Sequence, residues 1–288
     1  MSTINKYLKS PEVTGLAVTT KRLYNVALSY LNEFCKENEI NSFVRFQSKV
    51  PDLIAWMDKK KLGGKSKQRY LTVIKIFLKW NGTPIEYTYK ISNEEMKANK
   101  RKQLKRWFTE LEIDLCLAHN FPRYFGKPIT KVLLYKTIVR LLVETGARVR
   151  ELANIKAEDV DIKESIVWLY ESKTEPRPAF FSPTTKEMLE TLSQTIEWTG
   201  RIFPSTDRIK QMINEMLVEL NLKNGKDGRG CHTYRHWIAT KLFYDAEMRL
   251  EDIAMLLGDQ VDTIREHYLH PTPKMLQKKV VKAMGWEI

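Results

Sequence analysis

The chain has 288 residues, a formal net charge of +13, 43% hydrophobic residues and 29% charged residues. This length allows one large domain or two of ordinary size, and the composition excludes a disordered or collagen-like chain. It has no run of 18 apolar residues, and its opening lacks a secretory pattern, so we expect neither a membrane-spanning helix nor a secretory signal. Cys35, Cys116 and Cys231 are too few and too far apart for a disulfide framework or a zinc cluster, which predicts a reducing cytoplasm.

The positive charge is distributed unevenly along the chain. Residues 1–106 contain 22 Lys and Arg against 9 Asp and Glu, whereas residues 107–288 contain 26 of each kind. A charge that only kept the protein soluble would be spread evenly, so the first third favours a polyanionic partner. Each basic side chain placed on a phosphate releases condensed counterions, which makes nucleic acid the favoured partner over an acidic membrane surface.

Three helices are predicted in the first part of the chain. Apolar residues recur at intervals of three and four over 23–34, and a second, short helix follows Pro51. A third begins near Ser66 as its N-cap and ends at residues 81–82, an Asn-Gly pair. Its polar positions are basic and never acidic, which favours a face that follows a phosphate backbone over an ordinary solvated face. These positions are Lys65, Lys67, Arg69, Lys75 and Lys79.

A basic linker is predicted at residues 91–106, between a helical domain at 1–90 and a larger domain at 107–288. Six basic residues fall within its last ten positions. Such a run is often only solvated, but it would also fit along a duplex and close a clamp. The six are Lys97, Lys100, Arg101, Lys102, Lys105 and Arg106.

The larger domain has a mainly helical pattern with one β-hairpin. Thr109 and Glu112 form a capping box for a helix through residue 118, and the apolar helix 129–145 ends at Gly146. Residues 165–170 have the β-branched and aromatic character of a strand, with 179–181 as its partner and 173–178 as the turn. Further helices are expected at about 184–196, 208–221, 232–246, 250–257 and 272–284. The predicted fold class is therefore mainly α with a small antiparallel β-hairpin or sheet.

Four short blocks in this domain carry residues suited to chemistry. They are TGARVREL at 145–152, HTYR at 232–235, LLGD at 256–259 and YLH at 268–270. Arg148 and Arg235 lie 87 positions apart, and Tyr268 follows Arg235 by 33. In this order and spacing the blocks strongly resemble those of the tyrosine recombinase (phage-integrase) family, of the Xer-like kind. The resemblance covers about residues 107–288, whereas residues 1–90 resemble the family's core-binding domain only in size, helicity and charge.

The reaction of this family explains why these residue types are needed. Breaking a DNA phosphodiester without water or metal requires a nucleophile, an acid for the leaving 5′-oxygen and cations around the phosphorus. A tyrosine nucleophile conserves the bond energy as a phosphodiester, so rejoining needs no ATP. Arginine supplies fixed, bidentate, always-charged donors to phosphate oxygens, and preorganised charge of this kind is usually the largest catalytic contribution.

The resemblance implies a role for each matching residue. Tyr268 attacks the scissile phosphate and forms a 3′-phosphotyrosyl link, while Arg148 and Arg235 bind the non-bridging oxygens. Lys173, in the predicted hairpin turn, protonates the leaving 5′-oxygen. His232 assists proton transfer and contacts the phosphate.

Two further residues have supporting or competing roles. Glu151, one helical turn after Arg148, matches an acidic position that we expect to support the site rather than take part in the chemistry. Arg177 competes with Lys173 for the role of the hairpin cation, and Lys173 is favoured because it aligns with the family's lysine.

The spacing of His232 and His236 also fits a metal pair. However, Thr233 replaces the glutamate of an H-E-x-x-H motif, and no third ligand is evident. We therefore predict neither a metal nor a cofactor.

Asp259 departs from the family pattern, which has His or sometimes Trp at this position. Those side chains donate a hydrogen bond to the phosphate, whereas an ionised Asp only accepts and would repel it. Asp259 either turns away and pairs with a basic neighbour such as Arg265, or is held protonated. Alternatively, Gln260 or His267 donates in its place. Because the other five positions match, an active enzyme is favoured over a decayed one.

The sequence thus predicts a site-specific recombinase that clamps double-stranded DNA and exchanges strands on a homo-tetramer of synapsed sites. Free in solution, we expect a monomer or weak oligomer in the cytoplasm, associated with the nucleoid, with a host nucleus as an open alternative. One competing interpretation is a type IB topoisomerase, which shares the chemistry but relaxes supercoils as a monomer. Another is a non-catalytic DNA-binding protein that keeps the fold.

The charge distribution generates a direct test. Because the first third holds the whole surplus, residues 107–288 alone should bind DNA more weakly, and the slope of log affinity against log salt should fall by roughly 0.9 for each phosphate that the fragment no longer neutralises. The measurement is DNA affinity over a salt series for the full chain and the fragment. An unchanged slope would contradict the assignment.

Overall fold

The computed structural model describes residues 2–104, 106–122, 129–170, 175–198, 200–225, 227–271 and 273–285. The chain forms two compact units, Met1–Arg101 and Lys102–Ile288. The functional division at 1–90, 91–106 and 107–288 stays a prediction. Across the described residues, every helix is too short or too polar to cross a membrane.

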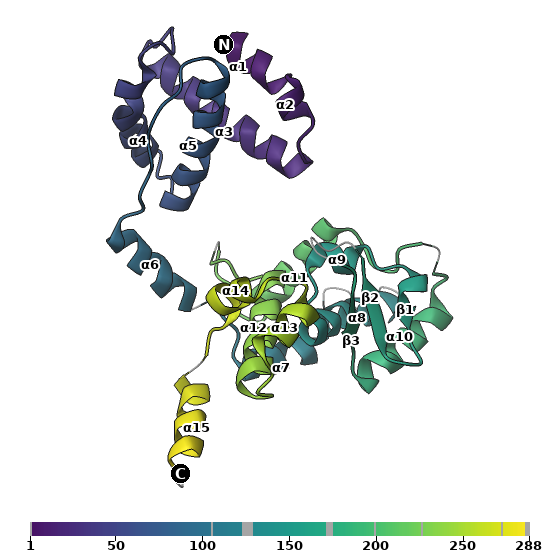
Figure 1. Ribbon diagram of the computed structural model, residues 1–288. Helices are drawn as coiled ribbons and strands as arrows, with labels where there is room; N and C mark the ends of the chain where they lie inside the picture. Colours follow the sequence, from purple (N-terminus) through teal and green to yellow (C-terminus); the bar gives the residue numbers. More distant parts are fainter. Residues whose placement is uncertain are drawn as a thin grey trace. The chain divides into compact units, whose positions relative to one another are not determined.

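The first unit is built from helices packed around one apolar core. Residues such as Leu31 of α3 and Phe77 of α5 are fully buried in this core. The three predicted helices are confirmed, but the third starts earlier than expected, because Gly63 rather than Ser66 is its N-cap. The helices of this unit are α1 Ser2–Leu8, α2 Pro11–Thr14, α3 Val18–Glu37, a 3-10 turn Phe46–Lys49, α4 Val50–Lys59 and α5 Gly64–Trp80 (Figure 1). Helix α6 Asn93–Leu104 follows them and extends across the boundary between the two units.

The second unit combines helices with a three-stranded antiparallel sheet of order β1-β2-β3. Val167 of β2 lies opposite Val160 of β1 and Ala179 of β3, which confirms the predicted hairpin and adds a third strand. The fold class predicted from the sequence is confirmed. The elements are α7 Glu110–Ala118, α8 Ile129–Thr145, α9 Val149–Ala153, a 3-10 turn Ala157–Asp159, β1 Val160–Asp161, β2 Ile166–Leu169, β3 Arg177–Phe180, α10 Pro183–Thr195, α11 Thr206–Glu219, α12 Cys231–Tyr244, α13 Leu250–Leu257, α14 Val261–Thr263, a π-helical turn Ile264–Tyr268 and α15 Pro273–Met284.

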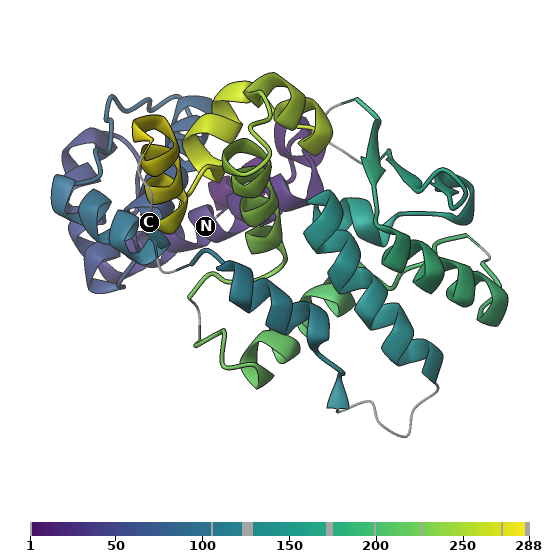
Figure 2. The same ribbon diagram turned by 90° about the horizontal axis from the view of Figure 1, so that it is seen from below.

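Helix α8 is the centre of this unit. It contacts α7, α9, α10, α11, α12 and β3, and α10 runs beside it (Figure 2). Gly146 ends the helix with a φ of 58°, and a Cβ there would lie 2.7 Å from side-chain atoms of both Ile238 and Leu257. Only glycine fits this left-handed, crowded turn. The turn therefore fixes where the chain leaves α8, two residues before Arg148.

A smaller apolar cluster joins α12, α13 and the π-helical turn. It buries Ala239, Ile253, Leu257, Ile264 and Tyr268. Turns of the π type are uncommon and occur often at functional sites. Here the turn delivers Tyr268 to the same region as the crowded end of α8.

Candidate active site

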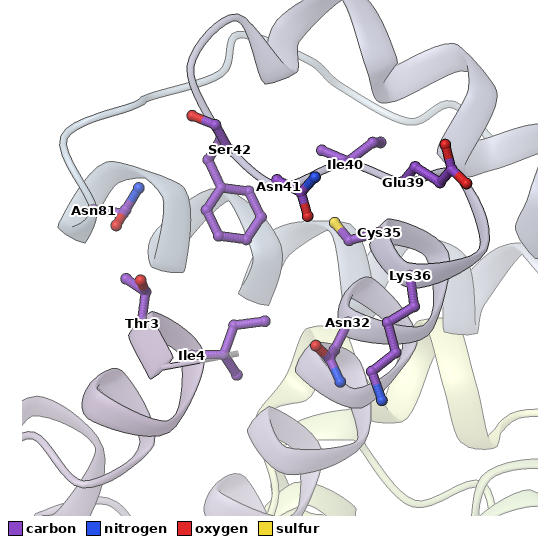
Figure 3. A pocket seen from close by; sticks show the side chains of 11 residues that line it. Thr3, Ile4, Asn32, Cys35, Lys36, Glu39, Ile40, Asn41, Ser42 and Asn81 are labelled. Atoms are coloured by element: carbon purple, nitrogen blue, oxygen red, sulfur yellow. The ribbon is translucent and has the colours of Figure 1, made fainter.

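A hollow of about 630 Å³ opens in the first unit, between α1, α3 and residues 39–43 (Figure 3). Its cysteine, Cys35, is buried, and burial raises the pKa of the thiol to about 11. A neutral thiol is a poor nucleophile at physiological pH. The residues suited to chemistry lie instead in the second unit.

Four elements of the second unit bring the predicted residues together. Arg148 is the N-cap of α9, and Arg235 lies within α12. Asp259 follows Gly258, whose φ of 60° ends α13, and Tyr268 closes the π-helical turn. Residues up to 120 positions apart in the sequence therefore meet at one place.

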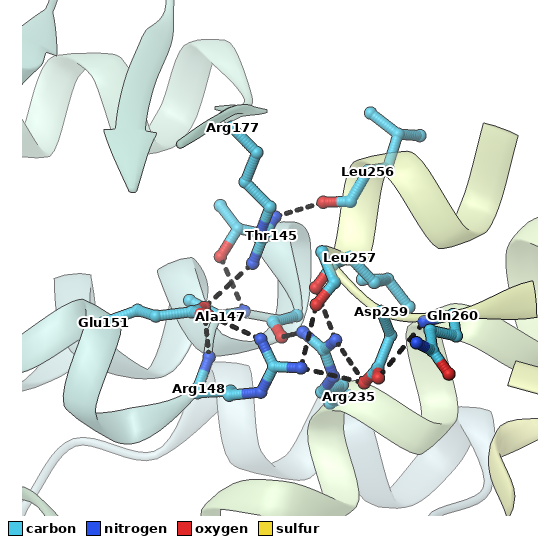
Figure 4. Close-up of polar contacts among 12 residues, drawn as sticks. Thr145, Ala147, Arg148, Glu151, Arg177, Arg235, Leu256, Leu257, Asp259 and Gln260 are labelled. Carbon is cyan, nitrogen blue, oxygen red and sulfur yellow. Dashed lines mark hydrogen bonds and ion pairs between the residues drawn. The ribbon is translucent and has the colours of Figure 1, made fainter. Parts of the chain in front are cut away.

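Glu151 holds the guanidinium of Arg148 in a fixed orientation. Arg148 donates from Nη1 to Glu151 Oε1 at 2.7 Å and from its backbone N–H to Oε2 at 2.8 Å (Figure 4). Arg177 donates to the same Oε2 at 2.9 Å. Burial acts to raise the pKa of Glu151, but the charges of Arg177 and Arg148 outweigh it and the pKa is lowered. Glu151 is thus an ionised, buried anchor for two cations.

Arg235 is completely buried, with its guanidinium at the C-terminal ends of two helices. Its Nη1 donates to Gly146 O, after α8, at 3.0 Å, and its Nη2 donates to Leu257 O of α13. Arg148 Nη2 reaches the neighbouring carbonyl of Gly258 at 2.9 Å. The terminal carbonyls of a helix carry partial negative charge, which stabilises both cations.

One carboxylate oxygen, Asp259 Oδ2, lies where the two arginines and the tyrosine converge. It accepts from Arg148 Nη2 at 2.8 Å, from Arg235 Nη2 at 3.1 Å and from the Tyr268 hydroxyl at 3.1 Å. Burial acts to raise the pKa of Asp259, but Arg235 and Arg148 prevail and lower it. Asp259 is therefore ionised and paired with cations, but it faces the site instead of turning away from it, as the predicted alternative had required. The partners are the site's own arginines, because Arg265 pairs with Asp262.

Tyr268 is buried among cationic and aromatic groups. Its ring centroid lies 5.3 Å from the Arg235 guanidinium, 4.5 Å from the His236 ring and 5.4 Å from the His232 ring. Burial raises the pKa of the hydroxyl, although Arg235 acts in the opposite direction. The hydroxyl is therefore protonated at neutral pH, and a nucleophilic attack by this oxygen would require a proton acceptor.

The two histidines beside Tyr268 are neutral at physiological pH. Loss of solvation and the charges of Arg235 and Arg148 lower the pKa of His232 to about 4. Burial is the largest cause that lowers the pKa of His236, to about 2, and the neighbouring His232, His270 and Arg235 act in the same direction. A neutral imidazole can accept a proton. In the part of the chain that the structure describes, no group of three or more His, Cys, Asp or Glu side chains could hold a metal.

Comparison with known proteins identifies this arrangement. The profile of the Phage integrase family matches residues 92–275. The chain belongs to the phage integrase family. The resemblance to tyrosine recombinases found in the sequence is confirmed, and the protein is a site-specific tyrosine recombinase.

Individual relatives of the recombinase agree with this assignment. Tyrosine recombinase XerA of Saccharolobus solfataricus is 23% identical over 98% of this chain and 92% of its own length. A probable integrase/recombinase of Acholeplasma phage L2 is 35% identical over 62% of this chain and 63% of its own length.

Solved structures share the fold. XerH recombinase bound to its difH substrate has a TM-score of 0.69 at 15% identity, covering 98% of this chain and 84% of that chain. Lambda integrase bound to DNA has a TM-score of 0.64 at 16% identity, covering 93% of this chain and 94% of that chain.

Arg177 of the recombinase has a structural place that the sequence did not reveal. Its side chain is 3% exposed, and it donates to Glu151 and to Leu256 O of α13. These contacts hold the Arg177 side chain inside the second unit, whereas Lys173 lies outside the described residues, so its role as the hairpin cation stays a prediction. Burial, more than any other cause, lowers the pKa of Arg177 to about 10, which still leaves it charged at neutral pH. The sequence placed Arg177 in the predicted turn 173–178, whereas the structure places it at the start of strand β3, with its side chain buried.

The predicted DNA-binding residues are placed in different environments. Lys65, Arg69 and Lys79 of α5 are exposed. Lys67 is 5% exposed and paired with Asp58, and Lys75 donates to a backbone carbonyl of the same unit, that of residue 87, at 3.1 Å. The side chains of Lys100, Arg101 and Lys102, and all of Lys105, lie outside the described parts.

The buried contact of Arg177 generates a stability prediction. Arg177→Ala leaves Glu151 buried with one cation fewer, so the free energy of unfolding should fall by about 3 kcal/mol. The measurement is urea unfolding of the full chain. Arg249→Ala, which removes an exposed pair with Asp252, is the control and should leave the stability close to unchanged. Equal effects of the two substitutions would contradict the anchoring role of Arg177.

Proposed function

We propose that this recombinase cleaves and rejoins double-stranded DNA through Tyr268, with Arg148 and Arg235 holding the scissile phosphate. The observation that carries the proposal is the position of the Asp259 carboxylate, which lies between the guanidinium groups of Arg148 and Arg235 and the hydroxyl of Tyr268. Asp259 Oδ2 accepts from both guanidinium groups and from the nucleophilic hydroxyl. A non-bridging phosphate oxygen has the same charge and the same accepting capacity, so it fits the same donors.

The chemistry then needs only side chains of the chain and the DNA. The Tyr268 oxygen attacks the phosphorus, its proton passes to the neutral imidazole of His232, and a 3′-phosphotyrosyl bond forms. The 5′-oxygen leaves as a hydroxyl after taking a proton, which the family resemblance assigns to Lys173. Attack by a 5′-hydroxyl on the phosphotyrosine reverses these transfers and rejoins the strand, with no metal, cofactor or ATP.

Asp259 must leave this position when the phosphate enters. Two unit negative charges about 5 Å apart at an effective dielectric near 20 repel by about 3 kcal/mol. While DNA is absent, the carboxylate neutralises Arg235, which is completely buried, and gives Arg148 a second anion beside Glu151. When DNA binds, a phosphate oxygen therefore replaces the Asp259 carboxylate as the hydrogen-bond acceptor, and the guanidinium groups of Arg148 and Arg235 already lie in position to donate to it.

We further propose that exchange takes place on a homo-tetramer of synapsed sites, formed from monomers or weak oligomers on cytoplasmic, nucleoid-associated DNA. The DNA complexes of XerH and lambda integrase support duplex DNA as the partner. Helix α15 exposes Leu276, Val280 and Met284, an apolar face that supports docking on a neighbouring subunit.

Tyr268 as the nucleophile is tested on a nicked suicide substrate, which traps the covalent intermediate. Tyr268→Phe removes the attacking oxygen and should form no covalent protein–DNA adduct, with DNA affinity retained. Tyr244→Phe, a tyrosine at the end of α12, is the control and should form adduct at the wild-type rate. Adduct in Tyr268→Phe, or its loss in Tyr244→Phe, would assign the nucleophile elsewhere.

Asp259 is tested by single-turnover cleavage of the same substrate. Asp259→Asn removes the repelling charge and keeps the shape, so the cleavage rate should stay within about tenfold of wild type, a barrier change of about 1.4 kcal/mol. Asp259→His restores a donor to the phosphate and should cleave at least as fast as the Asn variant. A loss of several orders of magnitude in folded Asp259→Asn would show that the carboxylate itself takes part in the chemistry.

A further inference from the structure

Trp107, which directly follows the predicted linker, lies in a stack of rings that ends at Tyr268. Its indole stacks on the His270 ring with a centroid distance of 3.8 Å and an interplanar angle of 6°. It also lies 4.0 Å from the His236 ring, and that ring lies 4.5 Å from the ring of Tyr268. Trp107 is therefore separated from the nucleophile by a single imidazole.

The backbone of the nucleophile is held to the same stack. Thr240 Oγ1 lies 3.0 Å from the carbonyl oxygen of Tyr268 and accepts the backbone N–H of His270 at 3.1 Å. His270 is thus tied both to the tyrosine backbone, through Thr240, and to Trp107, through its ring. A shift of Trp107 would therefore remove a ring contact from both His236 and His270.

Packing, and not hydrogen bonding, holds the indole in this place. Trp107 Nε1 and His236 Nδ1 are both buried without a hydrogen-bond partner among the described residues. Leaving two buried polar atoms unsatisfied costs stability, so the ring contact must supply a compensating gain.

Arg106, which directly precedes Trp107, holds the chain through separate contacts with residues 227 and 228. Arg106 Nε donates to Asp227 O at 3.3 Å, and its guanidinium lies so close over Gly228 that a Cβ there would approach it within 2.4 Å. The φ of 86° at Gly228 also favours glycine. The point where the linker enters the second unit is therefore held at two contacts, one of them next to the nucleophile.

We propose that Trp107 is a positioning residue for the nucleophile, which acts through His270 and His236 to hold the Tyr268 ring in the orientation for attack. The proposal rests on the proposed function of Tyr268. Small displacements of a reacting group cost large factors in rate, because the effective concentration of a well-aligned nucleophile is high. Loss of the planar ring at Trp107 should therefore slow the attack and leave DNA affinity unchanged.

The test compares three full-length variants on the nicked suicide substrate at saturating DNA. Trp107→Leu keeps an apolar side chain but loses the stack, and its rate of adduct formation should fall at least tenfold. Trp107→Phe keeps a planar ring and should recover most of the rate. Trp168→Ala, which removes an exposed tryptophan of β2, is the control and should match wild type. DNA affinity and unfolding temperature are measured for each variant.

A second substrate separates attack from departure of the leaving group. Sulfur in place of the bridging 5′-oxygen leaves as a thiolate, which needs no protonation. The defect of Trp107→Leu should persist on this substrate, because it concerns the nucleophile, whereas a defect in proton donation, as in Lys173→Ala, should be relieved.

Three results would overturn the proposal while leaving the proposed function intact. They are a wild-type rate in Trp107→Leu, a rate in folded Trp107→Phe as low as that of Trp107→Leu, and relief of the Trp107→Leu defect by the sulfur substrate. Absence of adduct with the wild-type protein would instead contradict the proposed function itself.

Discussion

The second unit depends on the neutralisation of three guanidinium groups, of which those of Arg177 and Arg235 are buried and that of Arg148 is partly exposed. Removing a cation from water costs several kcal/mol unless an anion and further acceptors replace the solvent. Glu151 pairs with Arg148 and Arg177, and Asp259 pairs with Arg148 and Arg235. The carbonyls at the ends of α8 and α13 supply further acceptors for the three guanidinium groups. This requirement fixes the relative positions of α8, α9, α12, α13 and β3.

The carboxylates of Glu151 and Asp259 differ in how firmly they are held beside their arginines. Glu151 is fully enclosed and bonded to the backbone of α9, so it remains with its cations throughout. Asp259 lies on a loop after α13 with part of its side chain open to solvent. In the proposed reaction a DNA phosphate replaces Asp259 beside the arginines. The site would then keep its charge balanced both with and without DNA.

Local patterns predicted most helices well, and the misses have physical causes. The apolar stripe and Gly146 gave α8 its exact bounds, and Thr109 with Glu112 gave the start of α7. Helices α1 and α2 have 7 and 4 residues, too few for a period of 3.6 to show. Lys67 was predicted to lie on a DNA-binding face, yet it is buried against Asp58, because a single sequence does not reveal which long side chains turn inward to pair within the domain.

The sequence by itself determined the family and the fold class, and it supplied the residues that we propose carry the chemistry, because a reaction at a phosphate requires particular residue types at fixed spacings. Only the tertiary structure decided how Asp259 is accommodated, what Arg177 contacts and where Trp107 lies. Each of these depends on contacts between residues 26 to 163 positions apart, across Arg177–Glu151, Arg148–Asp259 and Trp107–His270. Such contacts are created by the packing of whole elements and leave no periodic trace in the chain.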